Sequence, residues 1–110
     1  MTNDTPRIPV DLIADLARDT GQDPNELRVK FDLARRLYLR MEDAGITPLQ
    51  LEGLTEIDAE DISAICAYQV RIYPLWTILK LLTAAGMDVA IGVNEGGKDE
   101  AGLVYVVDDE

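Results

Sequence analysis

Residues 45–70 read GITPLQLEGLTEIDAEDISAICAYQV, and this stretch decides the fold. Thr47 is a good helix-capping residue and Pro48 fits the first position of a helix, so we expect a short helix that runs to about Leu54. Asp58 provides a second cap, with another acid three residues later in a box-like arrangement, which predicts a second short helix. Only a few residues separate the two, so the stretch predicts two short helices joined by a tight turn.

Apolar residues at helical spacing predict further helices on either side of this unit. The first spans about residues 10–19, the second residues 24–44 and the last residues 74–86. The long second helix opens on a capping residue followed by proline, as the two-helix unit does, and it stops at Gly45.

The chain has 110 residues and 47% apolar content, which suffices for one domain with a core that needs no disulfide or metal. Its apolar residues are mostly Leu, Ile, Val and Ala, the usual filling of a helical core. We expect Leu51 and Leu54 to face inward from the first short helix, and Ile62 and Ile65 from the second. Trp76 is expected in the core as well.

The hydrophobic period changes after the last helix. Val89, Ile91 and Val93 alternate with small residues, a polar loop covers residues 94–102, and residues 103–107 resume an apolar run. This pattern predicts a β-hairpin. Two strands alone are marginal in water, so they should pack on the helices or pair with a second copy of the chain, giving a homodimer.

The expected fold class is therefore mainly α, a domain of four to five helices with a C-terminal β-hairpin. We divide the chain into an N-terminal arm with a short helix at residues 1–24, the helical domain at residues 25–93, and the second hairpin strand with an acidic tail at residues 94–110.

The composition also restricts location and chemistry. The start lacks the layout of a signal peptide and Arg71, Lys80 and Asp88 interrupt the apolar stretch 62–93, so we expect a cytoplasmic protein with no membrane span. The chain has no histidine, and its single cysteine, Cys66, sits on an apolar stripe without a base to activate it. We therefore expect no enzymatic activity, no cofactor and no metal site.

Between residues 25 and 93, a set of residues recurs in a recognisable order and spacing. The set consists of Glu26-Leu27, Lys30, Leu33-Ala34, Gly45-Ile46-Thr47, Leu51, Leu54, Ile57, Ile62-Ser63, Ile65, Tyr73-Pro74-Leu75, Ile78-Leu79, Leu81-Leu82, Ala84-Ala85-Gly86 and Asp88-Val89. About two thirds of the chain thereby resembles the small XRE-type helix-turn-helix proteins, which include HigA-like antitoxins and phage-type repressors. The resemblance implies a lambda-repressor-like fold, with the second short helix in the position that lies in the major groove of DNA.

The charge of this chain departs from that family pattern. The positions that would meet base edges are Ala59, Glu60, Ser63 and Ala64, and Pro48 stands where members often carry a glutamine that reaches a phosphate. From Met41 to Val70 there is no Lys or Arg, and the stretch holds seven carboxylates: Glu42, Asp43, Glu52, Glu56, Asp58, Glu60 and Asp61. Each carboxylate placed ~4 Å from a phosphate would be repelled by about 1 kcal/mol even in water.

The resemblance and the charge together favour a regulator or inhibitor that binds a basic protein surface, such as a toxin or a nucleic-acid-binding complex. Its sharpest form is a DNA-mimicking inhibitor like some phage-encoded anti-CRISPR proteins, and its plainer form is a toxin-neutralising antitoxin. The expected partner-binding residues are Glu52, Glu56, Asp58, Glu60, Asp61 and Ser63. The alternative is a dimeric DNA-binding antitoxin or repressor that grips phosphates with Arg28, Arg35, Arg36, Arg40 and Arg71.

Overall fold

A computed structural model describes residues 23–96 and 102–107 of the chain, and this part is mainly helical. The helices are α2 (Pro24–Ala44), α3 (Pro48–Thr55), α4 (Ala59–Cys66) and α5 (Leu75–Ala84), which together hold 59% of the described residues. The predicted α class and the positions of these four helices are confirmed. The helix expected at residues 10–19 lies outside the described residues.

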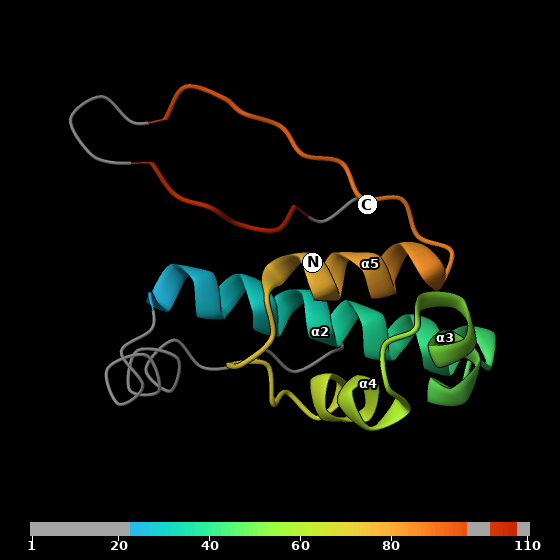
Figure 1. The fold of residues 1–110 in the computed structure, drawn as a ribbon. Helices are drawn as coiled ribbons and strands as arrows, with labels where there is room; N and C mark the ends of the chain where they lie inside the picture. Colours follow the sequence, from blue (N-terminus) through green and yellow to red (C-terminus); the bar gives the residue numbers. More distant parts are fainter. Residues whose placement is uncertain (1–22, 97–101, 108–110) are drawn as a thin grey trace.

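The long helix α2 is the centre of the domain (Figure 1). Helix α5 packs along one side of it and α4 along another, while α3 contacts both α4 and α5 and closes one end. None of the helices in the described ranges is both long and apolar enough to cross a membrane.

The core lies where the four helices meet. Its members with no exposed surface are Ala34, Leu37, Leu51, Ile62, Ile65, Ile78 and Leu81. Each helix contributes to this set, so burying their apolar surface holds all four helices together. Because helices of eight residues are too short to be stable alone, α3 and α4 depend on this packing.

Two residues predicted to be inside are exposed. Leu54 has 70% of its surface exposed, and Ile57, three residues later, packs against the core instead. Trp76 is 67% exposed because it lies about 200° around α5 from Ile78, which faces the core. Both predictions were wrong for the same reason, since helical spacing alone does not say which stripe meets a neighbour.

The helix boundaries follow from local hydrogen bonds and backbone angles. The Asp23 side chain accepts from the backbone N–H of Asn25 at the start of α2. Thr47 caps α3 together with Gln50 in a reciprocal capping box, with distances of 3.2 and 2.8 Å. Helix α2 ends at Gly45, whose φ of +68° lies in the left-handed region.

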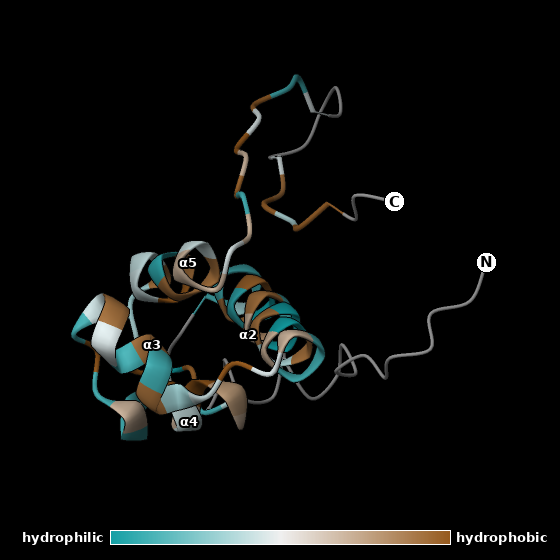
Figure 2. Ribbon diagram, turned by 90° about the vertical axis from the view of Figure 1, so that its right-hand side faces the viewer, coloured by the Kyte–Doolittle hydropathy of each residue, from teal (hydrophilic) through white to brown (hydrophobic). Residues whose placement is uncertain are grey.

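The predicted C-terminal β-hairpin is not found in the described residues. Residues 89–96 and 102–107 run as two extended segments beyond the helices (Figures 1 and 2), yet no strand is formed within these ranges. The second segment lies against the start of α2: with the Asn25 side-chain amide turned so that its oxygen and nitrogen both find partners, it donates to the Val104 carbonyl at 2.8 Å and accepts from the Val104 N–H at 2.9 Å. Val106 also packs against the core.

Replacing either of two glycines by alanine is expected to change stability, in opposite directions. Replacing Gly45 by alanine should lower the free energy of unfolding by about 1 kcal/mol, because its φ is positive and a side chain there is strained. Gly53 lies inside α3 with open space around it, so Gly53→Ala should raise the free energy of unfolding by roughly 0.5 to 1 kcal/mol. Urea unfolding of both variants measures the difference, and changes of the same sign would contradict these backbone assignments.

Candidate functional site

The six residues predicted to bind a partner lie on α3, on α4 and in the turn between them, two helices that pack against each other. They divide by environment into two groups. Glu56, Asp58, Glu60 and Ser63 are exposed, whereas Glu52 and Asp61 are half-buried. We call the three exposed carboxylates Glu56, Asp58 and Glu60 the acidic turn.

Glu52 has a structural role that the sequence did not indicate. Its Oε1 accepts a hydrogen bond from the backbone N–H of Ala59, the first residue of α4, at 3.0 Å. A carboxylate is favoured there because the first N–H groups of a helix lack partners and carry partial positive charge. Asp58 occupies the N-cap position but its side chain forms no capping hydrogen bond, so the predicted capping box between Asp58 and Asp61 was wrong.

Asp61 is also engaged within the protein. Its Oδ1 accepts from the hydroxyl of Tyr73 at 2.8 Å, which joins α4 to the loop before α5. This hydrogen bond is the main reason why the pKa of Tyr73 is raised, and partial burial and the negative charge of Asp61 raise it further. Asp61 therefore holds the loop in place as well as adding charge to this side of the domain.

The backbone between α3 and α4, which carries Glu56 and Asp58 of the acidic turn, has an unusual conformation at Glu56. Glu56 ends α3 with φ of +66°, in the left-handed region that glycine adopts without strain. Thr55 stabilises the same turn, since its Oγ1 donates to the Leu51 carbonyl at 2.7 Å and accepts from the Ile57 N–H at 3.1 Å. A residue other than glycine at such a position costs roughly 1 to 2 kcal/mol.

No cation neutralises the acidic turn within the described part of the chain. The salt bridges there all lie on α2, and they join Lys30 to Glu26, Arg35 to Asp32 and Arg36 to Asp32. Glu26 with Lys30 and Asp32 with Arg36 have the i, i+4 spacing at which opposite charges meet on one face of a helix. The exposed carboxylates thus face solvent with their charge uncompensated.

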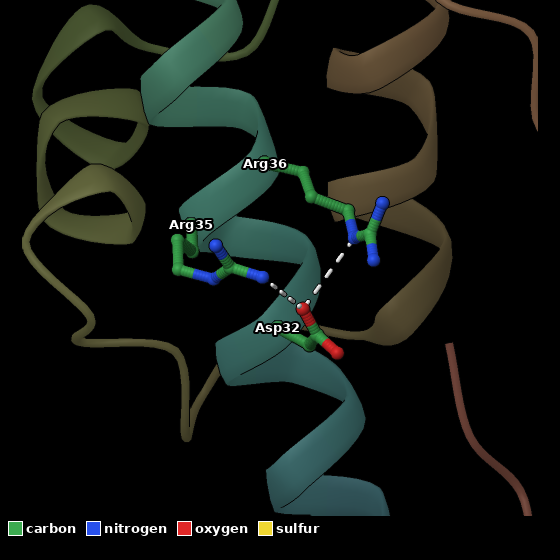
Figure 3. A network of polar contacts seen from close by, with 3 residues as sticks. All are labelled: Asp32, Arg35 and Arg36. Carbon is green, nitrogen blue, oxygen red and sulfur yellow. Dashed lines mark hydrogen bonds and ion pairs between the residues drawn. The ribbon is translucent and has the colours of Figure 1, made fainter. Parts of the chain in front are cut away.

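The arginines named for the DNA-binding alternative do not form one open basic face. Arg35 is buried and shares the Oδ1 atom of Asp32 with Arg36, at 3.2 and 3.4 Å (Figure 3). Arg40 donates from Nε to the Ala85 carbonyl at 2.8 Å, where the C-terminal end of α5 favours a cation. Arg28 and Arg71 are exposed. Three of the five guanidinium groups therefore serve contacts inside the domain.

Lys30 of α2 is buried, although lysine is usually exposed. Only 3% of the Lys30 surface is exposed, and its Nζ lies 3.4 Å from Glu26 Oε2 and 3.4 Å from the carbonyl oxygen of Arg71. The lysine thereby joins the first turns of α2 to the loop before α5. The i, i+4 pairing with Glu26 was visible in the sequence, but the contact across 41 residues depends on the fold.

A hollow of about 370 Å³ lies beside this loop, between the start of α2 and the end of α4. It is lined by Leu27, Phe31, Ala64, Tyr68, Gln69, Val70, Arg71, Ile72 and Tyr73. Phe31 and Tyr68 meet edge to face, with ring centroids 6.0 Å apart. The lining is mostly apolar and aromatic and contains no carboxylate or thiol.

The described residues offer little catalytic chemistry. Burial raises the pKa of the Cys66 thiol, whose Sγ contacts the Met41 sulfur at 3.7 Å, so the thiol is protonated at neutral pH and a poor nucleophile. Within the same residues, no three acidic or cysteine side chains converge as metal ligands would. What this part of the chain does present is exposed, uncompensated negative charge on a short helical turn.

The raised pKa of Tyr73 predicts how stability depends on pH. The protonated phenol stabilises the fold fully below its pKa in the unfolded chain, and this contribution is lost as the pH rises through the higher pKa of the folded state. Asp61→Ala removes both the hydrogen-bond acceptor and the charge, so the pKa of Tyr73 should fall toward its ordinary value, measured by NMR of the tyrosine ring carbons. Glu60→Ala is the control and should leave the pKa of Tyr73 unchanged. An unaltered Tyr73 titration in Asp61→Ala would show that Asp61 is not the cause.

Comparison of the chain with known protein families, with curated proteins and with solved structures yields no match.

Proposed function

We propose that this chain is a non-enzymatic regulator that binds a basic protein partner through the acidic turn and Ser63. The observation that carries the proposal is the exposure of Glu56, Asp58 and Glu60 on a stretch that contains no Lys or Arg from Met41 to Val70. Like charges gathered in this way oppose one another in the free protein, and a cationic partner would relieve that repulsion.

The backbone at Glu56 supports a role for this carboxylate beyond folding. Glycine would be the less strained residue at φ of +66°, yet the chain carries a charged side chain there. Glu56 makes no hydrogen bond or ion pair through its side chain in the described structure that would offset the strain. Retaining a carboxylate at this position is therefore consistent with its use in binding.

Glu52 and Asp61 take a different place in this proposal. Both carboxylates already accept hydrogen bonds within the domain, from Ala59 and Tyr73. They add to the negative potential of the surface, but their positions are set by the fold. We therefore assign direct contact with the partner to the acidic turn and Ser63, and a supporting electrostatic role to Glu52 and Asp61.

The scaffold suggests the nature of the partner. If α3 and α4 form the helix-turn-helix of an XRE-type domain, α4 takes the place of the helix that enters a groove of DNA. Carboxylates displayed on such a helix can imitate phosphates, so a nucleic-acid-binding groove rich in Lys and Arg is the fitting target. A basic toxin, neutralised by direct contact, satisfies the same electrostatic requirement.

The DNA-binding alternative is weaker on this surface. Arg35, Arg36 and Arg40 are engaged inside the domain, so they supply few of the phosphate contacts on which affinity for DNA usually depends. The acidic turn would in addition repel the backbone by about 1 kcal/mol for each close carboxylate.

Charge reversal of the acidic turn tests the proposal. In Glu56→Lys/Asp58→Lys/Glu60→Lys, capture of the partner from host lysate should be lost, because the attraction to a basic surface becomes repulsion. The control is Glu42→Lys/Asp43→Lys, which reverses two exposed carboxylates at the end of α2, outside the turn, and should still capture the same polypeptide.

Binding to duplex DNA of random and promoter-derived sequence, measured at low salt, completes the test. The unmodified protein should not bind, and the acidic-turn variant should gain weak, salt-sensitive binding if α4 can approach a groove. Tight DNA binding by the unmodified protein with a steep salt dependence would overturn the proposal in favour of the DNA-binding alternative. Equal capture by both variants would show that the acidic turn is not the contact surface.

A further inference from the structure

The segment that follows α5 exposes apolar side chains without any charge to protect them. Residues 89–93 read VAIGV, and their alternating large side chains are exposed by 38% at Val89, 77% at Ile91 and 93% at Val93. Proteins usually guard an exposed extended segment of this kind with lysine, proline or a covering element. None of the five residues is charged or a proline, so this segment is unguarded.

The backbone of this segment is unpaired as well. In the described structure no backbone hydrogen bond joins residues 89–96 to residues 102–107. In the amide orientation that satisfies both of its groups, Asn25 pairs with the N–H and the carbonyl of Val104, so one side of the second segment faces a partner on α2. Among the residues that the structure describes, none makes an equivalent contact with residues 89–93, whose N–H and C=O groups thus lack a partner there and can pair with another strand.

The sequence of the segment is complementary to itself. Valine stands at both ends, a small residue at each inner position and isoleucine at the centre. If two copies pair in antiparallel fashion about Ile91, Val89 of each copy faces Val93 of the other and the two Ile91 side chains meet on the two-fold axis. Because alternate residues of a strand share a face, all six large side chains then form one apolar patch.

We propose that residues 89–93 form an antiparallel β-strand pair with the same residues of a second copy, centred on Ile91. Such an interface is isologous, with one strand edge used by both partners. Pairing satisfies the backbone groups along one edge of each strand and brings two copies of a strongly acidic protein together where neither carries a charge. The interface is small and holds only two strands, so we expect weak dimerisation, with a dissociation constant of roughly hundreds of micromolar.

The flanking charges give the dimer a characteristic salt dependence. In this register Asp88 lies opposite Asn94 of the second copy and close to its Glu95, so the ends of the strand pair are mutually repulsive. Added NaCl screens this repulsion and should strengthen the dimer. A contact based on opposite charges would weaken under the same conditions.

Sedimentation velocity of the full chain over a concentration series tests the oligomeric state. We expect a monomer–dimer equilibrium that Ile91→Lys abolishes, while the helical circular dichroism signal is retained because the segment lies outside the four helices. Leu49→Lys, at a side chain of similar exposure on α3, is the matched control and should still dimerise. A chain that stays monomeric at every concentration, or a dimer that survives Ile91→Lys, would overturn the proposal.

Cysteine cross-linking tests the register itself. In a Cys66→Ser background, Ile91→Cys should form a disulfide between two copies under mild oxidation, because residues that face each other on the two-fold axis lie within bridging distance. Val93→Cys should not, because the two copies of residue 93 would be about 13 Å apart along the strands. Equal cross-linking at both positions, or cross-linking at residue 93 alone, would show that the copies do not pair about Ile91.

Discussion

Leu51 is the one fully buried residue of α3, and the position of the pair of helices α3 and α4 depends on it. It joins Leu37 of α2, Ile62 and Ile65 of α4 and Ile78 of α5 in a single core. Two helices of eight residues have no stability of their own, so this shared burial fixes where the turn between α3 and α4 lies. The locations of Glu52, Glu56, Asp58, Glu60 and Asp61 follow from that constraint.

The carboxylates of this unit serve two different purposes. Glu52 completes the start of α4 and Asp61 anchors the loop before α5, and both contributions are to the fold. Glu56, Asp58 and Glu60 make no such contacts, and Glu56 sits on a strained backbone. Glycine would be less strained than glutamate at this φ, and Glu56 gains no contact within the described domain in return. This combination is expected of a residue that binds a partner, so we assign the proposed function to the acidic turn.

The domain has a second feature that a single copy leaves incomplete. The helices bury their apolar stripes against one another, but the segment 89–93 keeps both its side chains and its backbone exposed. The acidic turn lies between α3 and α4 and on the first turn of α4, in a different part of the chain. A dimer formed through the segment would therefore present two acidic turns, and two linked sites raise the apparent affinity for a partner with two basic sites.

The four helices of the described structure were predictable from sequence alone, because a capping residue followed by proline, a terminal glycine and a 3.6-residue apolar period act within a few neighbouring residues. The same local information showed the exposed acids of the turn and the absence of basic residues around them. It did not reveal that Glu52 rather than Asp58 caps α4, that Trp76 and Leu54 face solvent, or that Arg35, Arg36 and Arg40 have internal partners. Nor did it show that residues 89–107 lack a strand ladder within the described ranges. These features depend on which faces of the helices meet in space, and only the packing of elements distant in sequence decides that.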